Sequence, residues 1–176
     1  RYLQSLGYTG ATGIQYGPIQ ADSDGFNGED NSYYDPAYNR LAFGHGGVDD
    51  NEDSDVILHE YGHAITHDIV PTWGGGDSGA IGEGYGDYWG ASYSSTTVNG
   101  QTFHPEWAFS WDGHGADTWS GRWLDMTNLT YDPTHTYGAH ETWQGVPNGS
   151  DQLWSAPLWQ SFLTLAGLGY PRTDMD

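Results

Sequence analysis

The segment that most constrains this fold is residues 54–68, SDVILHEYGHAITHD. Its apolar positions recur near the spacing of a helix face: Val56, Ile57, Ala64 and Ile65. Ser54 stands where an N-cap is expected, and Asp55 would then lie in the first turn, where the helix dipole favours a negative charge. Pro71 and the glycines after it end the pattern. We therefore predict a helix over these residues.

This predicted helix carries the pattern H-E-x-x-H, formed by His59, Glu60 and His63. Residues four apart lie on one face of a helix, so both imidazoles can reach one ion. Zinc accepts neutral imidazole nitrogen, and a catalytic zinc site keeps one position for water. Glu60 lies beside the pair and can take the proton of that water. Because so short a pattern also occurs by chance on helix surfaces, a third ligand has to be found.

Two positions near the motif do not supply this ligand. His67 continues the histidine stripe, but eight residues span about 12 Å along a helix, so it cannot share an ion with His59. We expect His67 to have a structural role. The zinc motif that continues with glycine and a third histidine is excluded, because those positions are Thr66 and Ile69.

Glu83 is the better third ligand, in the stretch GAIGEGYGD twenty residues beyond His63. It lies on a second predicted helix, from about residue 78 to 93, which follows a glycine-rich turn. Asp87, one helical turn later, can accept a hydrogen bond from a ligand imidazole, the usual device for orienting a metal-bound histidine. Asp55, four residues before His59, is a second candidate for this role.

HEYGHAITH followed by GAIGEGYGDYWG resembles the gluzincin peptidases, both thermolysin-like and fungalysin-like. VDDNEDSDVILHEYGHAI is most similar to fungalysin-like bacterial proteins, and the resemblance covers about residues 1–165, strongest over 27–93. It implies a secreted zinc endopeptidase that acts on extended peptides. Zinc would be held by His59, His63 and Glu83, with Glu60 as general base.

The resemblance extends to NSYYDPAYNRLAFGHGG, which looks like the edge strand and hairpin before the active-site helix of these families. Residues 32–43 read independently as two short strands around an Asp-Pro turn, and a further strand is expected around residues 14–19. The family positions that hold the substrate backbone match Asn31 and Ser32. Strand addition of this kind satisfies a peptide's backbone groups with little regard for its sequence.

Two catalytic positions depart from the family pattern. The tyrosine that polarises the scissile carbonyl in thermolysin-like enzymes corresponds to Gly74, with Trp73 beside it. The downstream histidine that contacts the tetrahedral intermediate corresponds to His140, because GAHE resembles the family's run, with His135 as the alternative. A last helix is predicted from about residue 152 to 165.

The composition restricts the partners. The chain has 24 acidic and 4 basic residues, no lysine and a formal net charge of -20. Nucleic-acid binding is excluded because it needs a basic surface, and an anionic membrane would repel the chain. No apolar run is long enough to span a bilayer. With no cysteine, disulfides and thiolate ligands are excluded, and 15% aromatic residues predict a core built from rings.

Two acidic segments are candidate calcium sites because calcium takes several oxygen ligands. The first contains five candidates: Asp22, Asp24, Asn27, Glu29 and Asp30. The second contains Asp49, Asp50 and Asp53. Neither follows the EF-hand pattern, since the twelfth position of the first segment is Tyr33. The alternative is a solvated acidic surface, which also keeps a protein hydrated in high salt.

We expect one α+β, zincin-like domain over residues 1–176, with a small, twisted, mostly antiparallel sheet on the active-site helix and a helical, irregular part after it. Its abrupt ends lead us to expect further parts of a larger polypeptide. One rival function is an extracellular structural or adhesive protein that retains a peptidase-derived zinc domain. A calcium-dependent glycan-binding module is a second rival. Asn128 and Asn148 fit the glycosylation acceptor pattern.

Overall fold

The computed structural model describes residues 2–74, 76–113, 121–125 and 151–171. The helices are α1 (Tyr2–Ser5), α2 (Ser54–Ile69), α3 (Gly76–Ser94) and α4 (Gln152–Gly167), with short 3-10 turns η1 (Gly10–Thr12) and η2 (Asp50–Glu52). The strands are β1 (Gln20–Asp22), β2 (Tyr33–Asp35), β3 (Arg40–Ala42), β4 (Trp107–Ala108) and β5 (Arg122–Trp123). The described part of the chain is therefore mixed α+β, as predicted at this coarse level.

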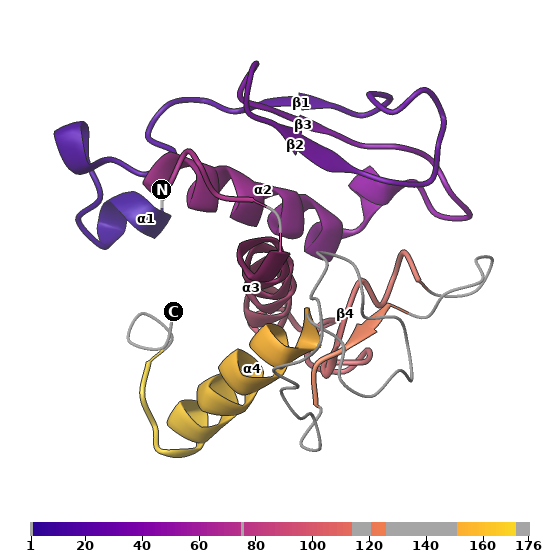
Figure 1. Cartoon of the computed structure of the whole chain (residues 1–176). Coiled ribbons are helices and arrows are strands. Elements are labelled where there is room, and N and C mark those ends of the chain that lie inside the picture. The colour runs from indigo at the N-terminus through magenta and orange to yellow at the C-terminus, as the bar shows by residue number, and fades with distance from the viewer. Residues whose placement is uncertain (1, 75, 114–120, 126–150, 172–176) are drawn as a thin grey trace.

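The elements are stacked in layers (Figure 1). A three-stranded sheet lies over α2, α3 lies on the other side of α2, and α4 packs against α3. The three long helices occur where the sequence predicts them, each extended by one or two residues at one or both ends. One detail of the prediction is wrong: the N-cap of α2 is Asp53, whose carboxylate accepts the Asp55 N–H at 2.8 Å, and Ser54 is the first helical residue.

The sheet has the order β1-β3-β2, so β2 is an edge strand. Strands β2 and β3 pair antiparallel, with Tyr34 opposite Leu41, which confirms the predicted hairpin around the Asp-Pro turn. Strand β1 instead pairs parallel with β3 and begins at Gln20 rather than near residue 14. Pro18 offers no backbone N–H to a ladder, and the pairing begins only after it. Strands β4 and β5 form a second, antiparallel pair.

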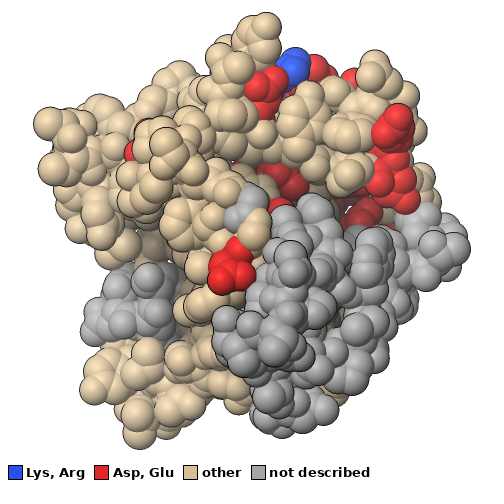
Figure 2. All heavy atoms as spheres, in the orientation of Figure 1, with Lys and Arg blue, Asp and Glu red and all other residues tan. Residues whose placement is uncertain are grey.

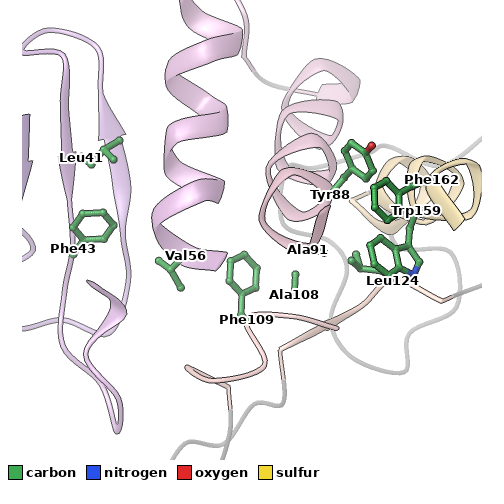
Figure 3. Close-up of a cluster of buried hydrophobic side chains, with 10 residues drawn as sticks. All are labelled: Leu41, Phe43, Val56, Tyr88, Ala91, Ala108, Phe109, Leu124, Trp159 and Phe162. Carbon is green, nitrogen blue, oxygen red and sulfur yellow. The ribbon is translucent and has the colours of Figure 1, made fainter. Parts of the chain in front are cut away.

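The main hydrophobic core runs from the sheet through the helices to the β4–β5 pair (Figure 3). It consists of ten buried residues: Leu41, Phe43, Val56, Tyr88, Ala91, Ala108, Phe109, Leu124, Trp159 and Phe162. Half of them are aromatic, and Trp159 stacks on Phe162 with ring centroids 5.3 Å apart. The prediction of a ring-rich core is therefore confirmed.

Helices α2 and α3 approach closely because glycines face each other across them. A Cβ added at Gly62 would stand 3.1 Å from the Cα of Gly86, so the two backbones nearly touch at this level. This contact brings the side chains just above and below it into mutual reach. None of the described helices combines the length and apolar character needed to cross a membrane.

Candidate metal centre

The contact between α2 and α3 brings His59, His63 and Glu83 together. The two imidazole Nε2 atoms are 3.1 Å apart, and the Glu83 carboxylate lies 3.1 Å from that of His59 and 3.3 Å from that of His63. A tetrahedral ion with bonds of about 2.0–2.1 Å holds its ligand atoms roughly 3.3–3.4 Å apart. The three donors therefore have nearly the spacing that a shared zinc ion requires. Two imidazoles and one carboxylate are also a donor set that zinc prefers.

Asp87 fixes the orientation of the first imidazole. Its carboxylate lies 2.9 Å from Nδ1 of His59 and is fully buried, so Nε2 of the same ring points at Glu83. Burial lowers the pKa of His59, but the hydrogen bonds with Asp87 and Glu83 outweigh it and raise the pKa to about 10. The Glu83 carboxyl, despite its burial, has a pKa well below its usual range because both imidazoles contact it. The structure thus places Asp87 in the position proposed for it.

Glu60 lies beside the donor set, and one oxygen of its carboxylate is left without a hydrogen bond in the described part of the chain. Its side chain is 6% exposed, and one donor atom each from Glu60, His59 and His63 fall within 4.8 Å of one another. Its Oε2 atom is buried and has no hydrogen-bond partner in the described part of the chain. Burial raises its pKa, while the two imidazoles act in the opposite direction. A buried carboxylate oxygen left without a partner is costly, and a proton-donating water would satisfy it.

Arg122 is a site residue that the sequence analysis missed. Its guanidinium lies 2.9 Å from Asp87 and 3.4 Å from Glu83, and it stacks over the Phe109 ring at 5.2 Å. Burial lowers the pKa of this guanidinium, but the carboxylates of Asp87 and Glu83 raise it by more, so the group stays charged. The guanidinium balances the two carboxylates that hold the imidazoles. The only signal for this residue in the sequence was the scarcity of positive charge, since the chain has four basic residues.

Asp55, the other carboxylate proposed to orient an imidazole, does not contact one among the described residues. It accepts hydrogen bonds from the Ser94 hydroxyl at 2.5 Å and from the Phe109 N–H at 3.1 Å. Helical spacing puts it on the same side of α2 as His59, but one turn closer to the loop after β4. It therefore joins the end of α3 to that loop. Burial, with a contribution from Asp53, raises its pKa to about 7.

His67 packs against the sheet, with its ring centroid 5.8 Å from that of Tyr34 on β2. The proposed peptide-binding residues precede that same strand. The Asn31 side chain accepts the Ser32 N–H at 2.9 Å, and the Ser32 hydroxyl donates to Asp50 at 2.5 Å. Asn31 is exposed next to an edge strand that contacts α2, whereas the Ser32 hydroxyl already has a partner.

The remaining catalytic candidates are placed only in part. Gly74 carries no side chain, but its neighbour Trp73 holds a buried indole N–H that has no hydrogen-bond partner in the described chain. That nitrogen lies 3.1 Å from where a Cβ on Gly82, the residue before Glu83, would stand. His140 and His135 lie outside the described residues, as do the acceptor motifs at Asn128 and Asn148.

The acidic segments do not form two separate clusters. Asp22 pairs with Arg40 at 3.3 Å, while Asp24 and Asp49 both contact His45, at 2.8 and 3.0 Å. Asp53 caps α2. One residue from each segment, Asp30 and Asp50, instead meets Asp112, which the sequence analysis did not consider. Glu29, from the same segment as Asp30, is not part of this carboxylate group.

Comparisons of the chain with protein-family models, with curated proteins and with solved structures gave no match. The functional assignment therefore depends on the chemistry of the site itself.

Proposed function

We propose that this protein is a zinc-dependent endopeptidase with a zincin-like fold. The observation that carries the proposal is the convergence of His59, His63 and Glu83 at ligand spacing, with the unpartnered Oε2 of Glu60 beside them. A site that served only to hold a structural ion would have no need of that carboxylate, because structural zinc is closed by four protein ligands. Three ligands and a base leave one position for chemistry.

Each residue has a role that follows from its position. His59, His63 and Glu83 would hold the zinc ion, which when bound polarises the scissile carbonyl and lowers the pKa of water. Glu60 accepts the proton of the attacking water and returns it to the leaving amine. Its raised pKa brings it nearer the range in which one group can do both. Asp87 keeps the His59 ring in orientation, and Arg122 holds Asp87.

An extended peptide is the substrate that the surroundings favour. Strand β2 is at the edge of the sheet and packs on the helix that carries the zinc motif, so a peptide added to this edge would run alongside the site. The exposed Asn31 amide stands at the start of this edge. We further propose that the protein acts outside the cell.

The test is casein cleavage by zinc-loaded protein, with and without a chelator. The Glu60→Gln variant should keep one zinc per chain but lose turnover, because the amide cannot accept the proton. The matched control is Glu52→Gln, which makes the same change at an exposed position and should cleave normally. Full activity of Glu60→Gln would refute the mechanism. A zinc-loaded wild type without cleavage would favour the rival function, a structural or adhesive protein that retains the zinc domain.

A further inference from the structure

A second group of metal-binding side chains lies away from the zinc motif. One carboxylate oxygen from each of Asp30, Asp50 and Asp112 falls within 4.8 Å of the other two. These residues come from the loop before β2, from η2 and from the segment after β4. Asp50 and Asp112 are each 3% exposed, so two of the three carboxylates are almost removed from water. Figure 2 shows how acidic atoms gather at one end of the sheet and in the hollow beneath it.

The Asp50 carboxylate has one oxygen that folding leaves unused. Its Oδ2 accepts the Ser32 hydroxyl at 2.5 Å, while Oδ1 is buried and has no hydrogen-bond partner in the described part of the chain. A buried carboxylate oxygen without a partner costs free energy, and buried charges are paired or coordinate metals. The burial of this unpartnered oxygen therefore indicates a ligand and not a solvated acidic surface.

The arginines of the described chain, and His45, pair with carboxylates outside this group. Arg40 pairs with Asp22 and Asp35 on the neighbouring strands of the sheet, and Arg122 pairs with Glu83 and Asp87 at the zinc motif. His45 lies between Asp24 and Asp49. The chain contains no lysine at all. None of these described side chains supplies a partner for the buried Oδ1 of Asp50.

We infer that Asp30, Asp50 and Asp112 bind a calcium ion. All the donors are oxygens, which suit a hard cation and not zinc. Calcium takes six to eight oxygen ligands in flexible geometry, which three carboxylates from different loops can provide together with backbone carbonyls and water. One such carbonyl is near: Val48 O and Asp30 Oδ1 both lie within 3.0 Å of the point where a Cβ on Gly46 would stand.

The ion would connect the three segments that carry Asp30, Asp50 and Asp112 next to the N-terminus of α2. Asp53, the N-cap of that helix, accepts the backbone N–H groups of Trp111 and Asp112 at 3.2 and 2.8 Å. The segment that supplies one calcium ligand is thus tied directly to the helix that carries the zinc motif. Calcium binding is therefore expected to stabilise the fold without touching the zinc ligands.

The first experiment titrates zinc-loaded, chelator-free protein with calcium by calorimetry. We expect one site per chain and a melting temperature that rises by roughly 5–10 °C at about 100 times the dissociation constant. Terbium should occupy the same site and, because Trp111 is adjacent to Asp112, show luminescence excited through tryptophan that calcium quenches. Absence of both calcium binding and terbium luminescence in the folded wild type would overturn the inference.

Two variants locate the site. Asp50→Asn should weaken calcium binding at least about tenfold, since it removes a charged ligand. Gly46→Ala should also weaken it, because the new methyl would stand 2.7 Å from Asp30 Oδ1 and displace that carboxylate. Neither variant touches the zinc ligands, so zinc content should stay at one per chain.

Each variant has a matched control. Glu52→Gln removes one negative charge from the same 3-10 turn at an exposed position. Gly17→Ala adds a methyl with no neighbour within 4 Å. Equal calcium affinity in all five proteins would place the ion elsewhere and overturn the inference, and so would a loss in Glu52→Gln as large as that in Asp50→Asn. If Asp50→Asn fails to fold, the pair Gly46→Ala and Gly17→Ala decides the question.

Discussion

Substitution of Gly86 by alanine tests the close approach of α2 and α3 at the candidate metal centre. A Cβ at this position would stand 2.6 Å from Nδ1 of His59, 2.9 Å from its Cγ and 3.0 Å from its Cε1. Ordinary contacts of a Cβ begin at 3.4 Å, so the ring or the helix must move by about 0.8 Å. The ring lies between Asp87 and Glu83, so any movement disturbs at least one of these contacts.

The expected effects on stability and on metal binding differ in size. Overpacking destabilises a fold by about 1–3 kcal/mol, whereas replacing glycine by alanine inside a helix stabilises it by about 0.8–1 kcal/mol. The free energy of unfolding should therefore fall by only roughly 0–2 kcal/mol. Zinc affinity should fall by about 10–100-fold, the usual effect of losing the partner that orients a metal-bound imidazole.

The assay measures zinc affinity by competition with a chromophoric chelator and stability by urea unfolding. The control is Gly167→Ala at the end of α4, where an added Cβ has no neighbour within 4 Å. The control should bind zinc like the wild type. If Gly86→Ala also binds zinc with wild-type affinity, His59 does not lie against α3 and the proposed ligand set is wrong.

Three further predictions concern the carboxylates and the arginine. Glu83→Ala should lower zinc affinity by more than Asp87→Asn does, measured by the same competition, because it removes a proposed ligand and not the partner of one. Arg122→Leu should lower the free energy of urea unfolding of the metal-free protein by about 3–5 kcal/mol, because it leaves buried carboxylates without their cation. The pKa of Asp55 is raised from 3.8 to about 7, so the folded state binds its proton more tightly and stability should fall as pH rises from about 4 through 7. Asp55→Asn should flatten this decline, and its stability relative to the wild type should be higher at pH 8 than at pH 5.

Three outcomes would contradict these expectations. Equal zinc affinities of the Glu83→Ala protein and the wild type would exclude this residue as a ligand. An Arg122→Leu protein as stable as the wild type would mean that the guanidinium does not balance the carboxylates. A stability difference between Asp55→Asn and the wild type that is the same at both pH values would show that this carboxyl is not the titrating group.

The sequence by itself determined the parts of this protein that depend on local geometry. The two imidazoles share a face because residues four apart do so in any α-helix, and the extent of α2 followed from its apolar period and the proline after it. The β2–β3 hairpin was likewise predictable from an Asp-Pro turn between two short apolar runs. The spacing to Glu83 pointed to a third donor, and the structure brings that carboxylate within 3.3 Å of both imidazoles.

Only the tertiary structure decided which distant residues meet. Arg122 reaches Asp87 across 35 positions, and Asp112 joins Asp50 from another loop, contacts that no local period encodes. The same holds for the parallel pairing of β1 with β3, since a parallel neighbour is set by the path of the chain between the strands. Asp55 shows the limit most clearly. Its spacing from His59 favoured an imidazole partner. In the folded chain its carboxylate instead accepts hydrogen bonds from the Phe109 N–H in the loop after β4 and from the Ser94 hydroxyl on α3.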